Sequence, residues 1–386
     1  MFATRAAASG TAALAMTALL LGGADVHAQG CVASRMEAPS SCPNHDSSGS
    51  METSGSGYSL MKGGWQASFG YRWFRSHRHF VGSVEQNADN VAKGLAARDR
   101  STSEVINHVH IPALGLAYGF SPRLSLSADL PIFLARRKSP GNATRPIDRT
   151  EARGIGDLSL MARYWVGNPK GHAPQNLAFG LGLKLPTGND KVEDDFLATY
   201  NAATGEKTTV RKPVDQSIQP GDGGLGIIAE FQAFKSVGRF TAFASGNYMS
   251  NPREQNDFLR DPTTANPSPL TAYLSIADQY AARAGVGTYY KKLGFSLGAR
   301  LEGVPSSDLI GGDLGRRRPG YSVAVEPTVS YSFKRTTFSA SVPYMVRRVR
   351  TQSYSDKVAS AESGRFENGD AAFADYVVIV GFSRRF

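Results

Sequence analysis

Hydrophobic and polar residues alternate with a period of two along most of this chain. In residues 124–134 the even positions are all apolar, and the odd positions include two serines and an aspartate. Similar alternation recurs at 158–166, 293–302 and 321–333. Because successive residues of a β-strand point to opposite faces, this pattern predicts strands with one apolar and one mixed face. Helical spacing fits none of these segments.

The chain holds twelve such segments, and the connections between them alternate in length. The predicted strands are 63–74, 104–120, 123–134, 154–166, 176–186, 222–235, 239–250, 276–290, 293–303, 321–333, 336–350 and 371–386. Long and short connections alternate along the chain. The long ones are 75–103, 135–153, 187–221, 251–275, 304–320 and 351–370. Outer-membrane barrels combine short periplasmic turns with long external loops in this way. The sequence therefore predicts an all-β fold, an antiparallel transmembrane β-barrel of about twelve strands over residues 63–386.

Aromatic residues gather near the ends of these segments, where the two membrane interfaces are expected. They are Trp65, Tyr71, Trp73, Tyr118, Phe120, Tyr164, Tyr280, Tyr290, Tyr331, Phe333, Tyr344, Phe382 and Phe386. One segment breaks its own pattern around Pro112, because Val109 and Ile111 occupy one face and Leu114 and Leu116 the other. A β-bulge that exchanges the faces is the predicted explanation.

The first residues indicate export. Arg5 precedes a short apolar stretch, 11–21, and Val26-His27-Ala28 supplies small residues suited to cleavage. Residues 1–28 are therefore predicted to be a signal peptide. Residues 29–62 are rich in Ser, Gly and Met and are predicted to form a flexible periplasmic segment ahead of the barrel. The predicted location is the outer membrane of a Gram-negative-type envelope.

Composition and charge agree with an exported barrel. No run of about 18 apolar residues follows the signal peptide, so the sequence predicts no membrane helix. The formal net charge is +10. An exported protein rarely meets nucleic acid, so the predicted counter-charge is the anionic headgroup of a lipid.

Both cysteines, Cys31 and Cys42, fall in the segment ahead of the barrel. In an oxidising compartment the favoured interpretation is one disulfide between them. The alternative is a soft-metal site that adds Met36, His45 and Met51. Acylation of Cys31 is disfavoured, because the residues before it make a poor lipobox. No other metal site and no cofactor is predicted.

Charged residues recur on the strand face opposite the predicted lipid face. Because Arg or Lys costs about 2–4 kcal/mol against acyl chains near the midplane, these residues are expected to line the lumen. The candidates are Arg72, Asp129, Arg163, Lys184, Glu230, Arg283, Arg300, Glu302 and Glu326. Both signs occur in similar numbers, so a filled interior of paired charges and a watery path both remain open. The longest loop, 187–221, is the candidate for a constriction that folds inward.

Basic clusters recur on the predicted external side. Their side chains are candidates to bind the phosphates of lipopolysaccharide. The candidates are Arg136, Arg137, Lys138, Arg316, Arg317, Arg318, Arg347 and Arg348. Solvated loop charge and an anion-attracting mouth of the channel are the alternatives.

The last strand resembles the C-terminal signal that the barrel-assembly machinery reads in outer-membrane proteins. Phe386 ends the chain, and Phe382 shares its face with Val378 and Val380. Arg384 departs from the apolar residue usual at its position. The resemblance implies that this machinery is a partner during insertion.

Two motifs carry a more specific resemblance. Gly154-Ile155-Gly156-Asp157-Leu158 opens one strand, and Lys184-Leu185-Pro186-Thr187-Gly188 closes the next. Together they resemble the hallmark of the outer-membrane transporter family named after the meta-pathway of phenol degradation, across about 35 residues. The resemblance implies a passive channel, with small hydrophobic or aromatic compounds as solutes. Bends at the barrel rim would also explain these glycines and Pro186.

An enzymatic role is disfavoured. His108 and His110 share one strand face and Ser245-Gly246-Asn247 lies on another segment, but no serine neighbours the histidines as in barrel hydrolases. The predicted function is a channel for passive passage of small solutes. The alternative is a non-conducting barrel that serves surface binding or envelope integrity.

Overall fold

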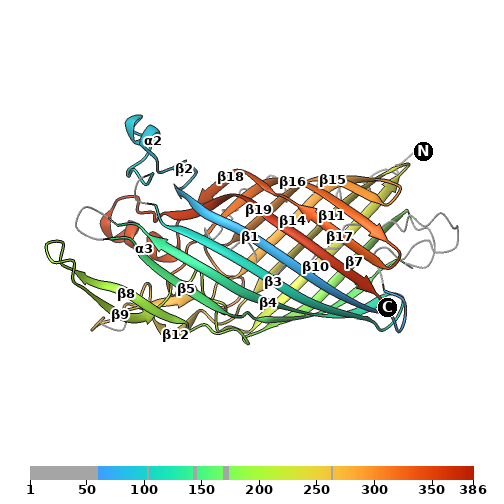
Figure 1. The fold of residues 1–386 in the computed structure, drawn as a ribbon, viewed down its shortest axis with the longest axis horizontal. Coiled ribbons are helices and arrows are strands. Elements are labelled where there is room, and N and C mark those ends of the chain that lie inside the picture. Colours follow the sequence, from blue (N-terminus) through green and yellow to red (C-terminus); the bar gives the residue numbers. More distant parts are fainter. Residues whose placement is uncertain (1–59, 102–103, 142–145, 168–173, 262–263) are drawn as a thin grey trace, which may run out of the picture.

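A computed structural model describes residues 60–101, 104–141, 146–167, 174–261 and 264–386. Among the described residues, fifteen strands form one antiparallel sheet that closes on itself, because β1 pairs with β19 along most of its length. The pairs β8–β9 and β12–β13 form two small separate sheets. Figure 1 shows the resulting barrel from the side, with the C-terminus at the end that carries the short turns.

All twelve predicted segments are strands of this wall. Two wall strands are interrupted: β5 and β6 both pair with β4, and β17 and β18 both pair with β16. The fold is therefore the predicted closed twelve-stranded barrel. The wall elements are β1 (Trp65–Val81), β3 (Ile106–Gly119), β4 (Leu124–Ser139), β5 (Asp148–Ile155), β6 (Leu158–Trp165), β7 (Gln175–Leu185), β10 (Gly226–Val237), β11 (Phe240–Ser250), β14 (Gln279–Tyr290), β15 (Leu293–Val304), β16 (Gly320–Phe333), β17 (Thr336–Ser341), β18 (Tyr344–Arg350) and β19 (Ala371–Arg385).

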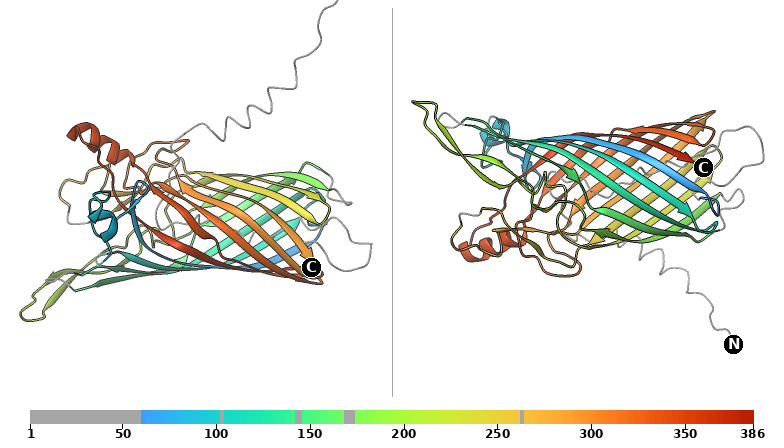
Figure 2. Two further views of the ribbon diagram at one scale, coloured as in Figure 1. Left: turned by 90° about the horizontal axis from the view of Figure 1, so that it is seen from above. Right: turned by 60° about the horizontal axis from the view of Figure 1, so that its bottom comes forward.

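The long connections lie together at the other end and carry the remaining elements, which are β2 (Val84–Glu85), α2 (Ala88–Ala92), β8 (Glu193–Tyr200), β9 (Lys207–Pro213), β12 (Gln255–Leu259), β13 (Tyr273–Ser275) and α3 (Tyr354–Ser363). The β8–β9 hairpin extends beyond the rim of the barrel (Figure 2). A capping box of Ser353 and Asp356 begins α3, and Gly364 ends it in the left-handed conformation. Among the described residues, no helix is long and apolar enough to cross a membrane.

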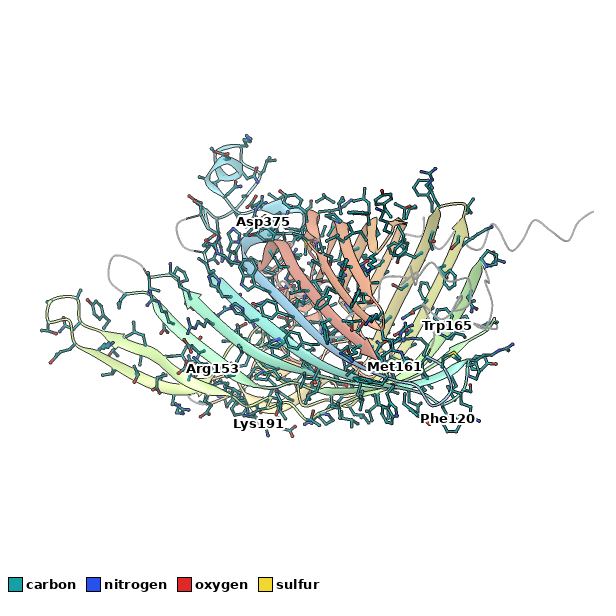
Figure 3. The ribbon with its side chains drawn as sticks, turned by 45° about the vertical axis from the view of Figure 1, so that its right-hand side comes forward. Phe120, Arg153, Met161, Trp165, Lys191 and Asp375 are labelled. Atoms are coloured by element: carbon teal, nitrogen blue, oxygen red, sulfur yellow. The ribbon has the colours of Figure 1, made fainter. Side chains whose placement is uncertain are left out.

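The outer surface of the barrel is apolar. Leu181 is 65% exposed, Leu297 60% and Leu114 53%, and many other large apolar side chains are exposed beside them. A continuous apolar surface of this extent around a barrel suits contact with lipid rather than with water. Figure 3 shows Phe120 at the short-turn end, where one interface is expected.

Several wall strands run further toward the long loops than the sequence pattern predicts. β1 reaches Val81 rather than residue 74, and β5 begins at Asp148 rather than at 154. The predicted bulge at Pro112 was wrong, because β1 and β3 keep one register through the pair Tyr71–Pro112. Val109 and Ile111 face the interior of the barrel instead, where they join an apolar cluster.

The terminal strand completes the wall. Phe382 pairs with Phe69 of β1, and its ring packs at a tilt against the ring of Phe338 of β17, with ring centroids 5.1 Å apart. Phe386 is 61% exposed, and its backbone N–H donates to the Trp65 carbonyl at 2.9 Å. Recognition of this C-terminal strand by the barrel-assembly machinery stays a prediction.

Candidate functional site in the barrel interior

The longest loop divides into an outward and an inward part. Its β8–β9 hairpin points away from the barrel, and the residues after β9, 214–222, fold back inside; we call them the inner segment. Val214 and Ile218 are 1% and 0% exposed. The predicted inward constriction is therefore found in the end of this loop alone.

The inner segment completes an apolar cluster inside the long-loop half of the barrel. Val214 and Ile218 pack in it with inward-facing residues of the wall. These are Phe74, Val109, Ile111, Phe133, Ala135, Ala152, Ala324, Met345, Ala374 and Val377. Apolar side chains aimed into a lumen are stable only when water is kept from them, and the inner segment provides that cover.

Polar contacts fix the inner segment in place. The side chain of Gln219 donates to the Val192 carbonyl at 3.0 Å and accepts from the Val192 N–H at 3.1 Å. Asp215 accepts two hydrogen bonds from Arg318, at 2.8 and 2.7 Å, and lies 3.4 Å from Arg137. Burial by itself would raise the pKa of Asp215, but the charges of Arg137 and Arg318 hold it well below its usual value.

The two sequence motifs meet at the foot of the inner segment. The Gly188 N–H donates to Asp157 at 2.9 Å, and Thr187 bonds the backbone on both sides of the break between β5 and β6. A Cβ on Gly221 would lie 2.4 Å from the Gly188 oxygen, so the two backbones touch. The motifs thus form a joint that directs the loop inward. Their residues have a structural role here, since they hold the end of the loop against the wall.

Lys184 belongs to the same joint. Its ammonium lies 3.7 Å from Asp157 and forms an ion pair with Asp222 at the end of the inner segment. The Lys184 side chain is 3% exposed. A charge this deeply buried needs its carboxylates, so the inner segment and the wall depend on each other here.

A network of buried ion pairs lies on the short-turn side of the apolar cluster. Arg72 of β1 reaches Glu302 of β15 at 2.9 Å, and Arg300 bridges Glu302 and Glu326 at 2.8 Å each. Arg283 joins Glu326 at 2.8 Å. Four of the five side chains are 8% exposed or less, so water has little access to this level of the interior.

A second inward pair lies on the other side of the barrel. Arg163 of β6 binds Glu230 of β10 at 2.7 Å across β7, where Gly180 lies between them. Asp129 lies over Gly115 of the neighbouring strand, where a Cβ would be 2.5 Å from its carboxylate. All nine residues that the sequence suggested for the lumen thus lie on the inner face, mostly paired.

Four of the eight basic residues proposed to contact lipopolysaccharide are turned inward, which corrects the prediction for those four. Arg137 and Arg318 bind Asp215, Arg317 is 2% exposed beside Asp308, and Arg348 binds Asp375 at 2.8 Å. These strands and loops rise beyond the apolar band, where the interior supplies carboxylates.

The outward arginines are few. Arg136 stands on the outer face with a side chain 69% exposed, 2.8 Å from Glu151, and Arg347 is also exposed. Lys138 is partly buried, and Arg316 lies at the barrel mouth near Arg318.

The two strand histidines lie on the outer face. His108 pairs laterally with Arg75 and Arg136, and the His110 ring lies 2.6 Å from the Tyr71 hydroxyl. They do not line the lumen, because the face of β3 that points inward carries the apolar Val109 and Ile111. Ser245 and Asn247 lie on β11, several strands away along the sheet.

The predicted signal peptide, Cys31, Cys42 and their possible metal partners Met36, His45 and Met51 lie outside the described residues. Within the part of the chain that the structure covers, no group of three or more His, Cys, Asp or Glu side chains could hold a metal ion.

The inner segment was not singled out residue by residue from the sequence. Val214 and Ile218 lie four positions apart in a polar loop. Val214 directly follows Pro213, and Ile218 lies two positions before Pro220. Two isolated apolar residues in such a loop were the only signal available.

Comparison with known proteins supports the fold. The COG4313 outer membrane channel from Pseudomonas putida F1 aligns with a TM-score of 0.54 and 14% identity over 87% of this chain and 100% of its own. The translocator domain of autotransporter NalP from Neisseria meningitidis gives 0.45 and 13%, over 84% and 89%. The P. putida toluene transporter TodX gives 0.41 and 9%, over 84% and 90%.

No family model and no curated protein matches the sequence. The first of these likenesses shows a common barrel fold, and the two with lower scores are too distant to support more. The resemblance to the phenol-pathway transporter family stays a prediction.

Proposed function

We propose that this protein is an outer-membrane channel for small hydrophobic compounds, aromatic ones among them, and that the inner segment closes it. One observation carries the proposal: the interior holds an apolar cluster that a loop segment, rather than the wall, completes and covers. A hydrophilic pore would gain nothing from Phe74, Ile111 and Phe133 on its inner face. An apolar solute that took the place of Val214 and Ile218 would bury the same surface.

The similar barrel from P. putida F1 is called an outer membrane channel, which agrees with this proposal. The ion-pair network next to the apolar cluster favours a closed resting state over an open aqueous pore. The non-conducting barrel is the alternative, because filled layers would also stiffen a purely structural barrel.

Entry of N-phenyl-naphthylamine into cells tests the proposal, since this apolar aromatic dye fluoresces once it passes the outer membrane. Cells with the wild-type protein should take it up faster than cells with the empty vector. A variant with residues 214–220 replaced by Gly and Ser should be faster again. Entry of a hydrophilic β-lactam should rise only in the variant. Equal dye entry in all three strains would support the non-conducting alternative.

The lipid partner is proposed on narrower grounds than the sequence suggested. Arg136 and Arg347 are exposed, and Arg136 lies on the outer face above the apolar band. We propose that these two contact phosphates of the outer leaflet, and that the inward arginines take no part.

A further inference from the structure

The charges of four arginines act on one aspartate at the mouth of the barrel. Arg137 comes from β4, Arg260 follows β12, and Arg316 and Arg318 lie between β15 and β16. Asp215 of the inner segment is the carboxylate that Arg137 and Arg318 bind. The nearby Asp261 lies 3.8 Å from Lys212. Positive charge therefore exceeds negative charge in this group.

Arg316 is the residue that this excess affects most. Its Nε atom is buried and donates no hydrogen bond within the described residues. The charge of Arg318, burial and the charge of Arg260 together lower the pKa of Arg316. Arginine does not lose its proton in proteins, so the lowered pKa means an unfavourable environment that a further anion would relieve.

Asp215 sits between two apolar side chains of the same segment. Val214 and Ile218 pack in the apolar cluster while the carboxylate of Asp215 binds Arg137 and Arg318. A small amphipathic acid has the same two parts, a carboxylate and an apolar body next to it. The inner segment thus occupies the mouth as such an acid would.

We propose that the four arginines form a binding site for the carboxylate of a small amphipathic acid, which competes with Asp215 and so releases the inner segment. This inference rests on the proposed function and adds to it a substrate class and an opening step. The acid would bind Arg316 and Arg318 through its carboxylate and place its apolar body against the apolar cluster, where Val214 and Ile218 now lie. No bond is made or broken, only ion pairs exchanged.

Binding of 4-fluorobenzoate to the refolded protein in detergent, followed by ¹⁹F NMR, tests this. The neutral 4-fluorobenzyl alcohol is the matched probe. Asp215→Asn removes the competitor and should tighten fluorobenzoate binding by about tenfold, the equivalent of one ion pair with modest net strength. Arg316→Gln should weaken it by a similar factor.

Arg316→Gln removes a cation that is unfavourably placed, so it should fold, which heat-modifiable migration of the barrel on a gel would verify. Arg153→Gln, on the neighbouring strand β5 with a side chain 64% exposed, is the control and should not change binding. Equal affinity of wild type and Asp215→Asn, binding that ignores Arg316→Gln, or equal binding of the alcohol would each overturn the site. If fluorobenzoate binds as expected but dye entry never depends on the protein, the site stands and the channel function fails.

Discussion

Replacing Glu302 with glutamine removes the carboxylate that Arg72 and Arg300 share. Both arginines contact it at 2.8–2.9 Å, and all three side chains are at most 8% exposed. Breaking a buried ion pair costs about 3–5 kcal/mol, because an uncompensated charge stays in a medium of low dielectric. Glutamine keeps one acceptor oxygen, and Glu326 still binds Arg300, so we expect the lower end, about 3 kcal/mol.

The measurement is urea unfolding of the refolded protein in lipid vesicles, followed by tryptophan fluorescence. Glu151→Gln is the matched control, because Glu151 also contacts two arginines at 2.8 Å but on the outer surface, with 42% of its side chain exposed. Exposed pairs contribute about 0–1 kcal/mol, so the control should change little. Equal losses in the two variants, or a loss below about 1 kcal/mol for Glu302→Gln, would refute the view that the network is buried and dry.

Three further predictions concern the closed state. Gly221→Ala should displace the inner segment and raise single-channel conductance, since its Cβ would lie 2.4 Å from a backbone oxygen. Gly154→Ala is the control: its Cβ would meet ordinary contacts near 3.4 Å, so conductance should stay unchanged. Acidification from pH 7 to pH 4 should leave conductance low. The pKa of Asp215 is lowered in the folded protein, so its ion pairs keep stabilising the inner segment until the pH falls through this lowered pKa. A rise in conductance near pH 4 would contradict this. Arg163→Ala should lower stability and leave conductance unchanged while the inner segment stays in place; a larger conductance would show that its pair with Glu230 limits flow.

The sequence predicted the features that depend on residues close together in the chain, and it missed those that depend on residues far apart. Strand number, order and loop lengths depend on local alternation and on the cost of charges in lipid, and both can be read from neighbouring residues. The inward charges followed from the same argument, because the apolar face of each strand must meet the lipid.

Alternation fails where strands leave the membrane, and there only the tertiary structure decided. Beyond the apolar band neither face must be apolar, so the pattern does not show that β4 continues to Ser139. That continuation is what turns Arg137 in to Asp215 and leaves Arg136 facing out. The sequence pattern predicted that Val109 and Ile111 face lipid. They face inward instead, where Ile218, more than 100 positions away, covers them. The sequence by itself determined the barrel. What fills it depended on contacts between residues far apart in the chain, which no local pattern records.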